Sequence, residues 1–564
     1  MHLQLLLRRG SEQSLAYHLP VSRRASRRWV AGLSAALVTA AGCADLLGIG
    51  DYRDFCKPYG VGDPPDCVYG PSGASTTTGS GGAGASDSTG GGGTGAGAGG
   101  NGGAGGSTRV VVGERSATFV TPSNQHTNTV DLSETHLGAY VWSSGGFEFH
   151  PAQGSPNGTF DIDDVPVGDY ALSFGDSTKP TFYVTNANHV DLSYVTLGGP
   201  AQTPAKLASP VTLNVANLSL WEDTNHIDFV SLSNGASIQS LELYDVPPDP
   251  GSASWSTTFD WSLVPFPPNL MSQFDTLTIT QLATATNGGA TYLAASRAAT
   301  IAFTQTDGTP VTQDVTLAPV PQDQQIALTW SVDSFDQLAP EVNPDATPQA
   351  ELFDLFVGLQ AADGQAATAP FPPRLAEFAP PTGAPVSTTL TYGDPFPASA
   401  LRYAVYKSSF AVQVTLSGAP ARTFTASATT WHLVSGNADT TTPIISPPHN
   451  VNIDGASFWS PATLVTDTPV VTWDGPMIGQ ADAYLVTVYD VHVSGGRLTF
   501  IPTGFVTTPR KKLRIPPGLI PAGGHTMIVV TAVAQPGLHL ETAPFRSTLP
   551  YATAPAISAV FTAP

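Results

Sequence analysis

Residues 158–172 run Gly-Thr-Phe-Asp-Ile-Asp-Asp-Val-Pro-Val-Gly-Asp-Tyr-Ala-Leu. Phe160 and Ile162 alternate with aspartates, as the buried and exposed faces of a strand require. A proline and a glycine then favour a turn, and the alternation restarts at Tyr170 in a return strand. The stretch therefore predicts a β-hairpin with one buried face.

The composition extends this strand pattern to the whole chain. Only 12% of the 564 residues are charged, while there are 56 glycines and 50 prolines. Such a mixture favours short strands joined by turns over long charged helices. The length far exceeds one domain of ~100–200 residues. We predict an all-β protein of several β-sandwich domains.

The acidic net charge of the protein makes some classes of binding partner unfavourable. The net charge is -21, and removing residues 1–42, with six of the 23 basic and one of the 44 acidic residues, leaves 17 against 43, or -26. An acidic surface repels phosphate backbones and anionic headgroups. We therefore predict no nucleic-acid partner.

The N-terminal segment has the order of an export signal. Two arginine pairs in residues 23–28 precede an apolar run over 29–41, which ends in small residues before Cys43. These cationic, apolar and small-residue segments follow the order of a secretory signal. The apolar run is too short to span a bilayer. The placement of Cys43 resembles the bacterial lipobox, which implies a 1–42 signal peptide and acylation of Cys43. A simple secretory signal that happens to contain a cysteine is the alternative.

The same resemblance implies a subcellular location. Ala44 rather than aspartate follows Cys43, which by Gram-negative sorting rules implies an outer-membrane lipoprotein, with surface exposure an open option. In residues 43–69 the remaining cysteines, Cys56 and Cys67, would pair as a disulfide in an oxidising compartment, with metal binding the weaker alternative. Residues 70–107 are almost all Gly, Ser, Thr and Ala, which predicts a disordered tether.

Two folded modules resemble known families. Residues 108–200, with the stretch quoted above, resemble a carboxypeptidase regulatory-like, or transthyretin-like, β-sandwich, which carries no catalytic residues. Two Val-Asp-Leu-Ser copies, at 130–133 and 190–193, are expected to be strands whose Asp or Ser bonds local backbone at the exit.

Residues 448–564 resemble a fibronectin type III domain. A strand with Trp473, an alternating strand that begins near Tyr484, a proline-glycine corner and a valine-rich closing strand occur in the right order. His525 and Thr526 stand where that family places its corner tyrosine. Trp473 and Tyr484 are assigned to the core.

The centre, residues 201–447, is β-rich and forms one or two domains. Strand-like runs recur, and the Pro- and Ala-rich stretch from 338 to 385 is expected to be an insertion or the junction of two sandwiches. Trp255, Phe259 and Trp261 share one face of a strand, so they are either a platform for sugar rings or, as we favour, core residues. We predict no cofactor and no metal, because the spacing of five candidate ligands in the first module matches no zinc site: His126, Asp131, Glu134, His136 and His150.

These observations favour a lipid-anchored, non-enzymatic protein that displays β-sandwich binding or adhesion modules. Its expected partners are the membrane, through the acyl anchor, and a polysaccharide or an envelope protein. One alternative is a secreted hydrolase with its catalytic module in 201–447, which requires paired carboxylates or a Ser/His pair in one cleft. The other is an assembly subunit of the envelope, which requires an unpaired sheet edge.

Overall fold

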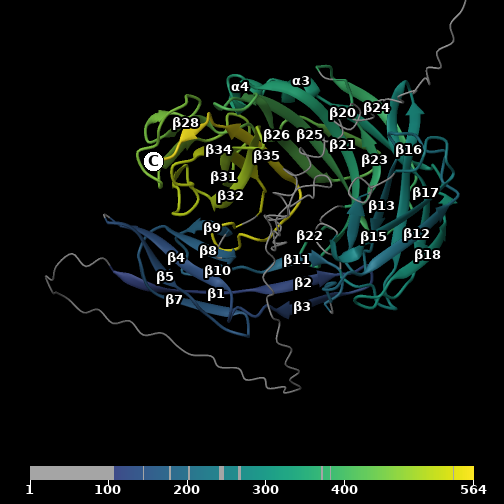
Figure 1. Ribbon diagram of the computed structural model, residues 1–564, viewed down its shortest axis with the longest axis horizontal. Coiled ribbons are helices and arrows are strands. Elements are labelled where there is room, and N and C mark those ends of the chain that lie inside the picture. Colours follow the sequence, from purple (N-terminus) through teal and green to yellow (C-terminus); the bar gives the residue numbers. More distant parts are fainter. Residues whose placement is uncertain are drawn as a thin grey trace, which may run out of the picture.

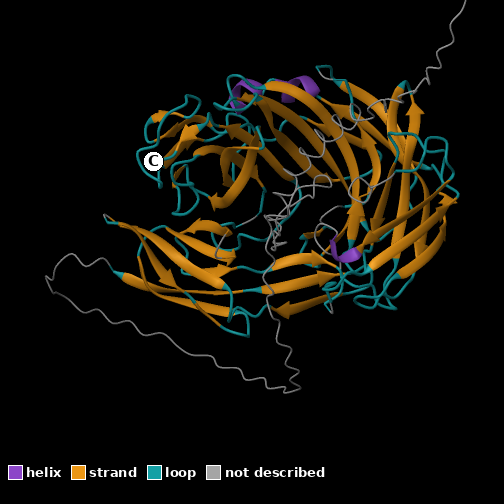
Figure 2. Cartoon of the chain, in the orientation of Figure 1, coloured by secondary structure: helices purple, strands orange, loops and turns teal. Residues whose placement is uncertain are grey.

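The structure is a computed structural model that describes residues 107–143, 145–176, 179–200, 203–239, 247–263, 269–369, 372–381, 383–537 and 539–564. Within these ranges strands dominate (Figure 2), beside one short 3-10 turn and two short helices, α3 (Val332–Asp336) and α4 (Ala339–Val342). The all-β prediction is confirmed. The predictions for Cys43, Cys56, Cys67 and the tether up to residue 106 lie outside the described residues. No helix within the described ranges is long and apolar enough to cross a membrane.

The first unit, residues 108–197, is a β-sandwich. A sheet in the order β10-β1-β7-β6 faces a second in the order β5-β4-β8-β9, and Phe160, Ile162, Tyr170 and Leu172 are buried between them. The strands are β1 (Thr108–Glu114), β4 (His136–Ser143), β5 (Gly146–Pro151), β6 (Gln153–Gly154), β7 (Thr159–Pro166), β8 (Tyr170–Asp176), β9 (Lys179–Thr185) and β10 (His189–Asp191).

The predicted hairpin in residues 158–172 is wrong, although both its strands exist. β7 pairs with β1 and β6, whereas β8 pairs with β4 and β9. The turn around Gly168, which has a φ of 142°, therefore carries the chain from one sheet to the other. Alternation reveals which side chains are buried but not the partner strand, because both sheets of a sandwich face the same core.

Both Val-Asp-Leu-Ser copies bond local backbone as predicted, but only the second begins in a strand, β10, whereas residues 130–133 lie in the loop and turn that follow residue 129. The Ser133 N–H donates to Asp131 Oδ1 at 2.8 Å, and the Ser193 N–H donates to Asp191 Oδ1 at 2.9 Å. After the second copy the chain enters a small sheet in the order β11-β2-β3. Its strands are β2 (Ser116–Val120), β3 (Gln125–Thr129) and β11 (Tyr194–Leu197).

The fourth unit, residues 449–562, is a β-sandwich of two sheets. A sheet in the order β29-β28-β30-β33 faces one in the order β32-β31-β34-β35. Trp473 and Tyr484 are buried with ring centroids 5.1 Å apart, edge to face, which confirms their core assignment. The strands are β28 (His449–Ile453), β29 (Ala456–Ser457), β30 (Val470–Asp474), β31 (Ala483–Ser494), β32 (Arg497–Thr508), β33 (Lys512–Arg514), β34 (His525–Ala534), β35 (Tyr551–Ile557) and β36 (Phe561–Thr562).

The second unit, residues 203–319, has its own hydrophobic core, in which Phe229 and Trp261 are fully buried. A sheet in the order β15-β12-β18 faces one in the order β14-β13-β16-β17. The strands are β12 (Pro210–Ala216), β13 (His226–Val230), β14 (Ser237–Gln239), β15 (Ser254–Asp260), β16 (Leu277–Asn287), β17 (Ala290–Ile301), β18 (Val311–Thr316) and β19 (Ala318–Pro319).

The third unit, residues 324–441, packs a sheet in the order β24-β20-β27 against one in the order β23-β21-β25-β26. Trp330 of the first sheet meets Tyr406 of the second, with ring centroids 5.2 Å apart. The strands are β20 (Gln324–Trp330), β21 (Thr347–Gln360), β22 (Ala366–Ala367), β23 (Arg374–Phe378), β24 (Val386–Tyr392), β25 (Leu401–Val414), β26 (Arg422–Leu433) and β27 (Ala438–Thr441).

The stretch from 338 to 385 is neither an insertion nor a junction. It contains β21, which lies between β23 and β25 and is buried without a break over residues 351–359. Its prolines and alanines fall mainly in helix α4 and in the loops around β22 and after β23, while the apolar run between them forms the strand. Composition averaged over the whole stretch therefore hid a core strand.

The first three units repeat one pattern of pairing. In each, the first strand pairs antiparallel with a middle strand and parallel with a late strand. The triplets are β7-β1-β10, β15-β12-β18 and β24-β20-β27. This repetition is visible in the strand pairing, whereas the sequence shows no convincing period.

One sheet of each unit belongs to a continuous sheet of 19 strands. Its main ribbon takes four strands from each unit, and β19, β22 and β36 pair beside it. The order of the ribbon is β14-β13-β16-β17-β23-β21-β25-β26-β35-β34-β31-β32-β9-β8-β4-β5. The units are joined by the pairs β17–β23, β26–β35 and β32–β9, so the fourth unit pairs with the first. Figure 1 shows the resulting ring, with the yellow C-terminal strands beside the blue N-terminal ones.

Candidate binding site at the junction of three units

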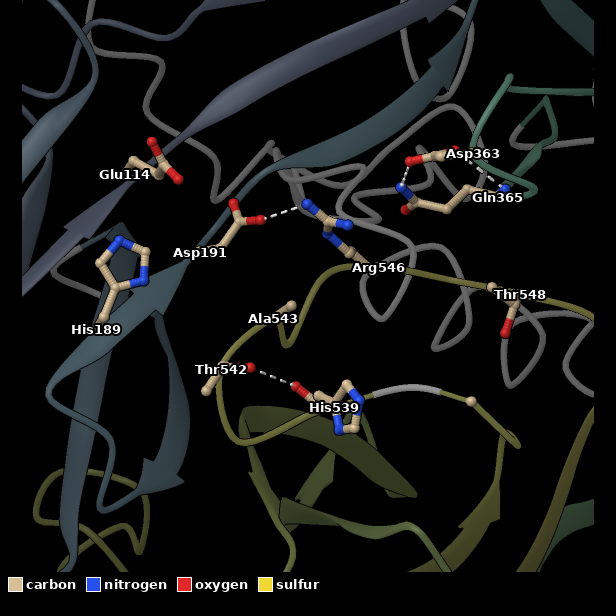
Figure 3. A pocket seen from close by; sticks show the side chains of 11 residues that line it. Glu114, His189, Asp191, Asp363, Gln365, His539, Thr542, Ala543, Arg546 and Thr548 are labelled. Carbon is tan, nitrogen blue, oxygen red and sulfur yellow. Dashed lines mark hydrogen bonds and ion pairs between the residues drawn. The ribbon is translucent and has the colours of Figure 1, made fainter. Parts of the chain in front are cut away.

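A pocket of about 400 Å³ lies where the first, third and fourth units meet (Figure 3). The first unit contributes side chains from the ends of β1 and β10, the third unit contributes the turn between β21 and β22, and the fourth contributes the long connection between β34 and β35. The lining residues are Glu114, His189, Asp191, Asp363, Gln365, Gly537, His539, Thr542, Ala543, Arg546 and Thr548.

Hydrogen bonds and ion pairs fasten the β34–β35 connection to the first unit. The Asp191 N–H donates to the Thr542 carbonyl at 2.6 Å, and the Thr185 hydroxyl donates to the Glu541 carbonyl at 2.7 Å. Arg546 Nη2 lies 2.6 Å from Asp191 Oδ2. Arg510 lies 3.0 Å from Asp169 of the first unit and 2.8 Å from Glu541. These contacts position one wall of the pocket.

Asp191 is ionised where it contacts the β34–β35 connection. Burial alone would raise its pKa, but hydrogen bonds from Ser193 and the charge of Arg546 outweigh that effect, and the pKa is lowered. The aspartate of the second Val-Asp-Leu-Ser copy thus orders its own turn and also pairs with an arginine 355 residues away.

Three polar atoms around the pocket are buried without a hydrogen-bond partner: Gln365 Oε1, Arg546 Nε and Thr548 Oγ1. Gln365 is 6% exposed, and its Nε2 donates to Asp363 Oδ2 at 2.5 Å. That bond, drawn in Figure 3, fixes the amide so that Oε1 is left as an acceptor. A buried polar group without a partner costs ~1–3 kcal/mol. These three atoms have almost no accessible surface, so a molecule in the pocket does not contact them directly.

A second group of ionisable side chains is buried between the second and third units. Arg374 of β23 lies 3.1 Å from Asp228 of β13 through Nη2 and also pairs with Glu377 through Nη1. Asp354 of β21 stands opposite Glu377 in the register of the sheet. Asp228, Asp354 and Arg374 are all at most 5% exposed.

Burial and mutual charge determine the protonation of this group. Burial and then the charge of Glu377 raise the pKa of Asp354, and burial and then Arg374 lower the pKa of His226. Burial alone would lower the pKa of Arg374, but Asp228 and Glu377 raise it overall. With Asp354 and His226 neutral, the charges of Arg374 and the nearby Lys407 balance those of Asp228 and Glu377. The arrangement is that of a neutral buried network.

The aromatic residues proposed as an alternative sugar platform lie in the core of the second unit. Trp255 is 7% exposed and Trp261 is 0% exposed, while Phe259 is partly buried and stacks on Trp261 at 6.0 Å between centroids. Trp261 also lies beyond the end of β15, in a 3-10 turn, so the three rings do not form one strand face. The three rings therefore pack inside the second unit, with Phe259 at the edge of its core.

The candidate metal ligands of the first unit are not brought together. Among the described ranges, no group of three or more His, Cys, Asp or Glu side chains is placed to hold a metal ion. Asp131 is engaged by Ser133, whose hydroxyl and N–H lower its pKa. His136 stacks on Phe149 with 5.7 Å between the ring centroids.

An exposed aromatic pair on β4 and β5 was missed from the sequence. Trp142 is 44% exposed and Phe149 is 37% exposed, and Phe147 packs edge-on against Trp142 at 5.1 Å. The Arg514 guanidinium of the fourth unit lies 3.7 Å from the Trp142 ring centroid, so this tryptophan also serves the contact between units. Aromatic residues at 140, 142, 147 and 149 alternate along two strands, and that alternation is the signal that could have found them.

Comparisons with known proteins add little. A scan against protein-family models finds no match, and a search of curated proteins finds no relative. Among solved structures, the FN1–FN3 domains of chicken CNTN1 are 12% identical, with 69% of this chain and 94% of that chain covered at a TM-score of 0.12. The Bacillus anthracis TIE protein is 12% identical, with 76% and 70% covered at a TM-score of 0.11. Likenesses this weak carry no argument about fold or function.

Proposed function

We propose that this chain is an exported, lipid-anchored binding protein of the bacterial envelope, without enzymatic activity. The export signal, the lipobox-like Cys43 and the low-complexity tether support anchoring to the outer membrane. Several acyl chains would hold the protein firmly, because each buried CH₂ contributes ~0.8 kcal/mol. Cys56 and Cys67 would close a small disulfide loop next to the anchor.

The observation that carries the binding role is the junction pocket. Its walls come from three units that a continuous sheet and several ion pairs hold together, and charged and polar side chains line it. Rigid, pre-positioned polar groups in a concave site are what a binding protein needs. The ring would act as one body on a tether, presenting this site to an envelope polysaccharide or protein.

The buried ionic network weighs against the hydrolase alternative. Carboxylates do gather within 201–447, but Arg374 is bonded to two of them and the group is buried. A glycoside hydrolase needs two carboxyl groups flanking an accessible bond, ~5–10 Å apart. The assembly alternative is supported by unpaired sheet edges, since β5 and β14 at the ends of the ribbon each pair with one strand among the described residues, as do β3 and β15 in the smaller sheets.

Cells that express the full chain with radiolabelled palmitate test the anchor. We expect label in the wild-type protein and in Cys56→Ser, and no label in Cys43→Ser. The labelled protein should fractionate with the outer membrane, and its first residue, by mass spectrometry, should be an acylated Cys43. Label that persists in Cys43→Ser, or a mature form that begins at another residue, would refute lipid anchoring at this site.

A further inference from the structure

We propose that the β5 end of the ribbon binds a second copy of this chain, and that the two β5 strands pair antiparallel across a two-fold axis. The contact surface is the free edge of β5 together with the outward face of the β4–β5 hairpin. A two-fold contact brings the same surface of both copies together, so that surface must complement itself. This inference goes beyond the binding role proposed above and does not depend on it.

The backbone of β5 has hydrogen-bonding groups that no described strand uses. The Ala152 N–H donates to the Leu137 carbonyl at 3.0 Å, and this pair continues the register of β4 and β5. Hydrogen-bonded and non-hydrogen-bonded pairs alternate along an antiparallel ladder. Phe147 and Phe149 therefore stand in non-hydrogen-bonded pairs, and their N–H and C=O groups point away from β4. Such an edge can accept a further strand.

An exposed aromatic ring distinguishes this edge from the others. Among the described strands that pair with only one neighbour, β5 alone contains an exposed large hydrophobic residue, Phe149. Sheet edges are commonly protected by lysine, by proline or by a bulge, and in β5 the only such residue is Pro151 at its last position. The neighbouring Trp142 is already engaged by Arg514, so Phe149 is the ring that a partner strand would cover.

The ring of Phe149 is held in place before any partner binds. It stacks on His136 with 5.7 Å between the ring centroids and meets Tyr140 at 4.7 Å. A Cβ atom at Gly138 would lie 2.5 Å from the Phe149 ring, so the ring covers the backbone of this glycine. A side chain that is already ordered loses little conformational entropy when a partner covers it.

Charge selects between the two registers that centre on the middle of β5. With Glu148 on the axis, each Glu148 would face the partner's Glu148, and like charges directly opposite each other are destabilising. With Phe149 on the axis, each Glu148 faces the partner's His150, and the two Phe149 rings face each other. The Phe149 N–H groups then donate to each other's carbonyls, and each Phe147 N–H donates to the carbonyl of the partner's Pro151.

Sedimentation equilibrium of the full mature chain in density-matched detergent tests the proposal. We expect the share of dimer to rise as the protein concentration is raised from about 1 µM to about 100 µM. Phe149→Lys should weaken dimerisation by about tenfold or more, because two lysines would face each other on the axis. The matched control is Phe274→Lys, the same change at an 82% exposed phenylalanine of the second unit, which should dimerise as the wild type does.

A cross-link tests the register, and it decides the matter if Phe149→Lys does not fold. In Phe149→Cys, mild oxidation should join residue 149 of one copy to residue 149 of the other, because directly opposite residues lie ~5.5 Å apart at Cα. Glu148→Cys should not join to its own copy, since the two positions are diagonal and ~7–8 Å apart. Mass spectrometry after proteolysis identifies the linked peptides.

Three outcomes overturn the proposal. A chain that stays monomeric at the highest of these concentrations would leave the β5 edge to a strand of another envelope protein. Normal dimerisation of Phe149→Lys would place the contact elsewhere, and a cross-link through Glu148→Cys but not Phe149→Cys would contradict the register. None of these outcomes affects palmitate labelling, so the anchor and the dimer are tested separately.

Discussion

Replacing Arg374 by methionine should lower the free energy of unfolding by about 3–5 kcal/mol. Methionine keeps much of the side-chain volume but removes the charge, so the cost is electrostatic rather than a cavity. Asp228 and Glu377 would then be left as buried carboxylates without their cation. Urea denaturation followed by tryptophan fluorescence would measure the loss.

The matched control is Arg497→Met, which removes an exposed arginine near the start of β32 and should change the free energy by no more than ~0.5 kcal/mol. A double variant, Arg374→Met with Asp228→Asn, should recover part of the loss because it removes one of the orphaned charges. If Arg374→Met lowers the free energy of unfolding by less than ~1 kcal/mol, water reaches these charges and the cluster is not buried as described.

The contribution of Glu351 to the free energy of unfolding should fall as the pH rises from about 4.5 toward about 9. Burial raises the pKa of Glu351 from 4.5 to about 9, against a hydrogen bond from Ser408 and with a further contribution from Asp336. The folded state thus binds a proton that the unfolded chain releases at lower pH. Its stabilising effect is complete below about pH 4.5 and is lost as the pH rises to about 9, over which it amounts to a few kcal/mol.

Glu351→Gln should flatten this dependence, because glutamine stays neutral throughout and resembles the protonated acid. Thermal unfolding at one-unit steps from pH 4 to pH 10 would show the difference in slope. Glu148→Gln, at a largely exposed carboxylate on β5, should keep the wild-type slope. Equal slopes in wild type and Glu351→Gln would show that Glu351 is ionised in the folded protein at neutral pH.

Local strand pattern was predictable from the sequence, and pairing was not. The alternation of Phe160 and Ile162 identified buried positions correctly, and so did the assignment of Trp473 and Tyr484 to a core. Each depends only on neighbours along one strand. The same pattern could not reveal that β7 and β8 belong to opposite sheets, since inward-facing residues look alike in both.

The candidate site was beyond sequence reasoning for a different reason. Asp191, Gln365 and Arg546 are far apart in the chain and meet only because β9 pairs with β32 and β21 with β25. Asp191 was noted for its turn, yet nothing nearby in the sequence indicates its arginine partner. Three aromatic residues between Trp255 and Trp261 could form either a sugar-binding platform or a core, because large rings serve both purposes.

The closure of the ring, on which the junction pocket depends, can be tested by one cross-link. Thr181 of β9 and Phe505 of β32 are register partners, and neighbouring strands lie ~4.8 Å apart, within disulfide range. In the full chain carrying Thr181→Cys and Phe505→Cys, mild oxidation should join the two peptides, as detected by mass spectrometry after proteolysis. Thr181→Cys with Thr423→Cys on β26 should not cross-link. If the 181–505 pair stays reduced under conditions that oxidise exposed thiols, the first and fourth units are not paired and the ring does not close.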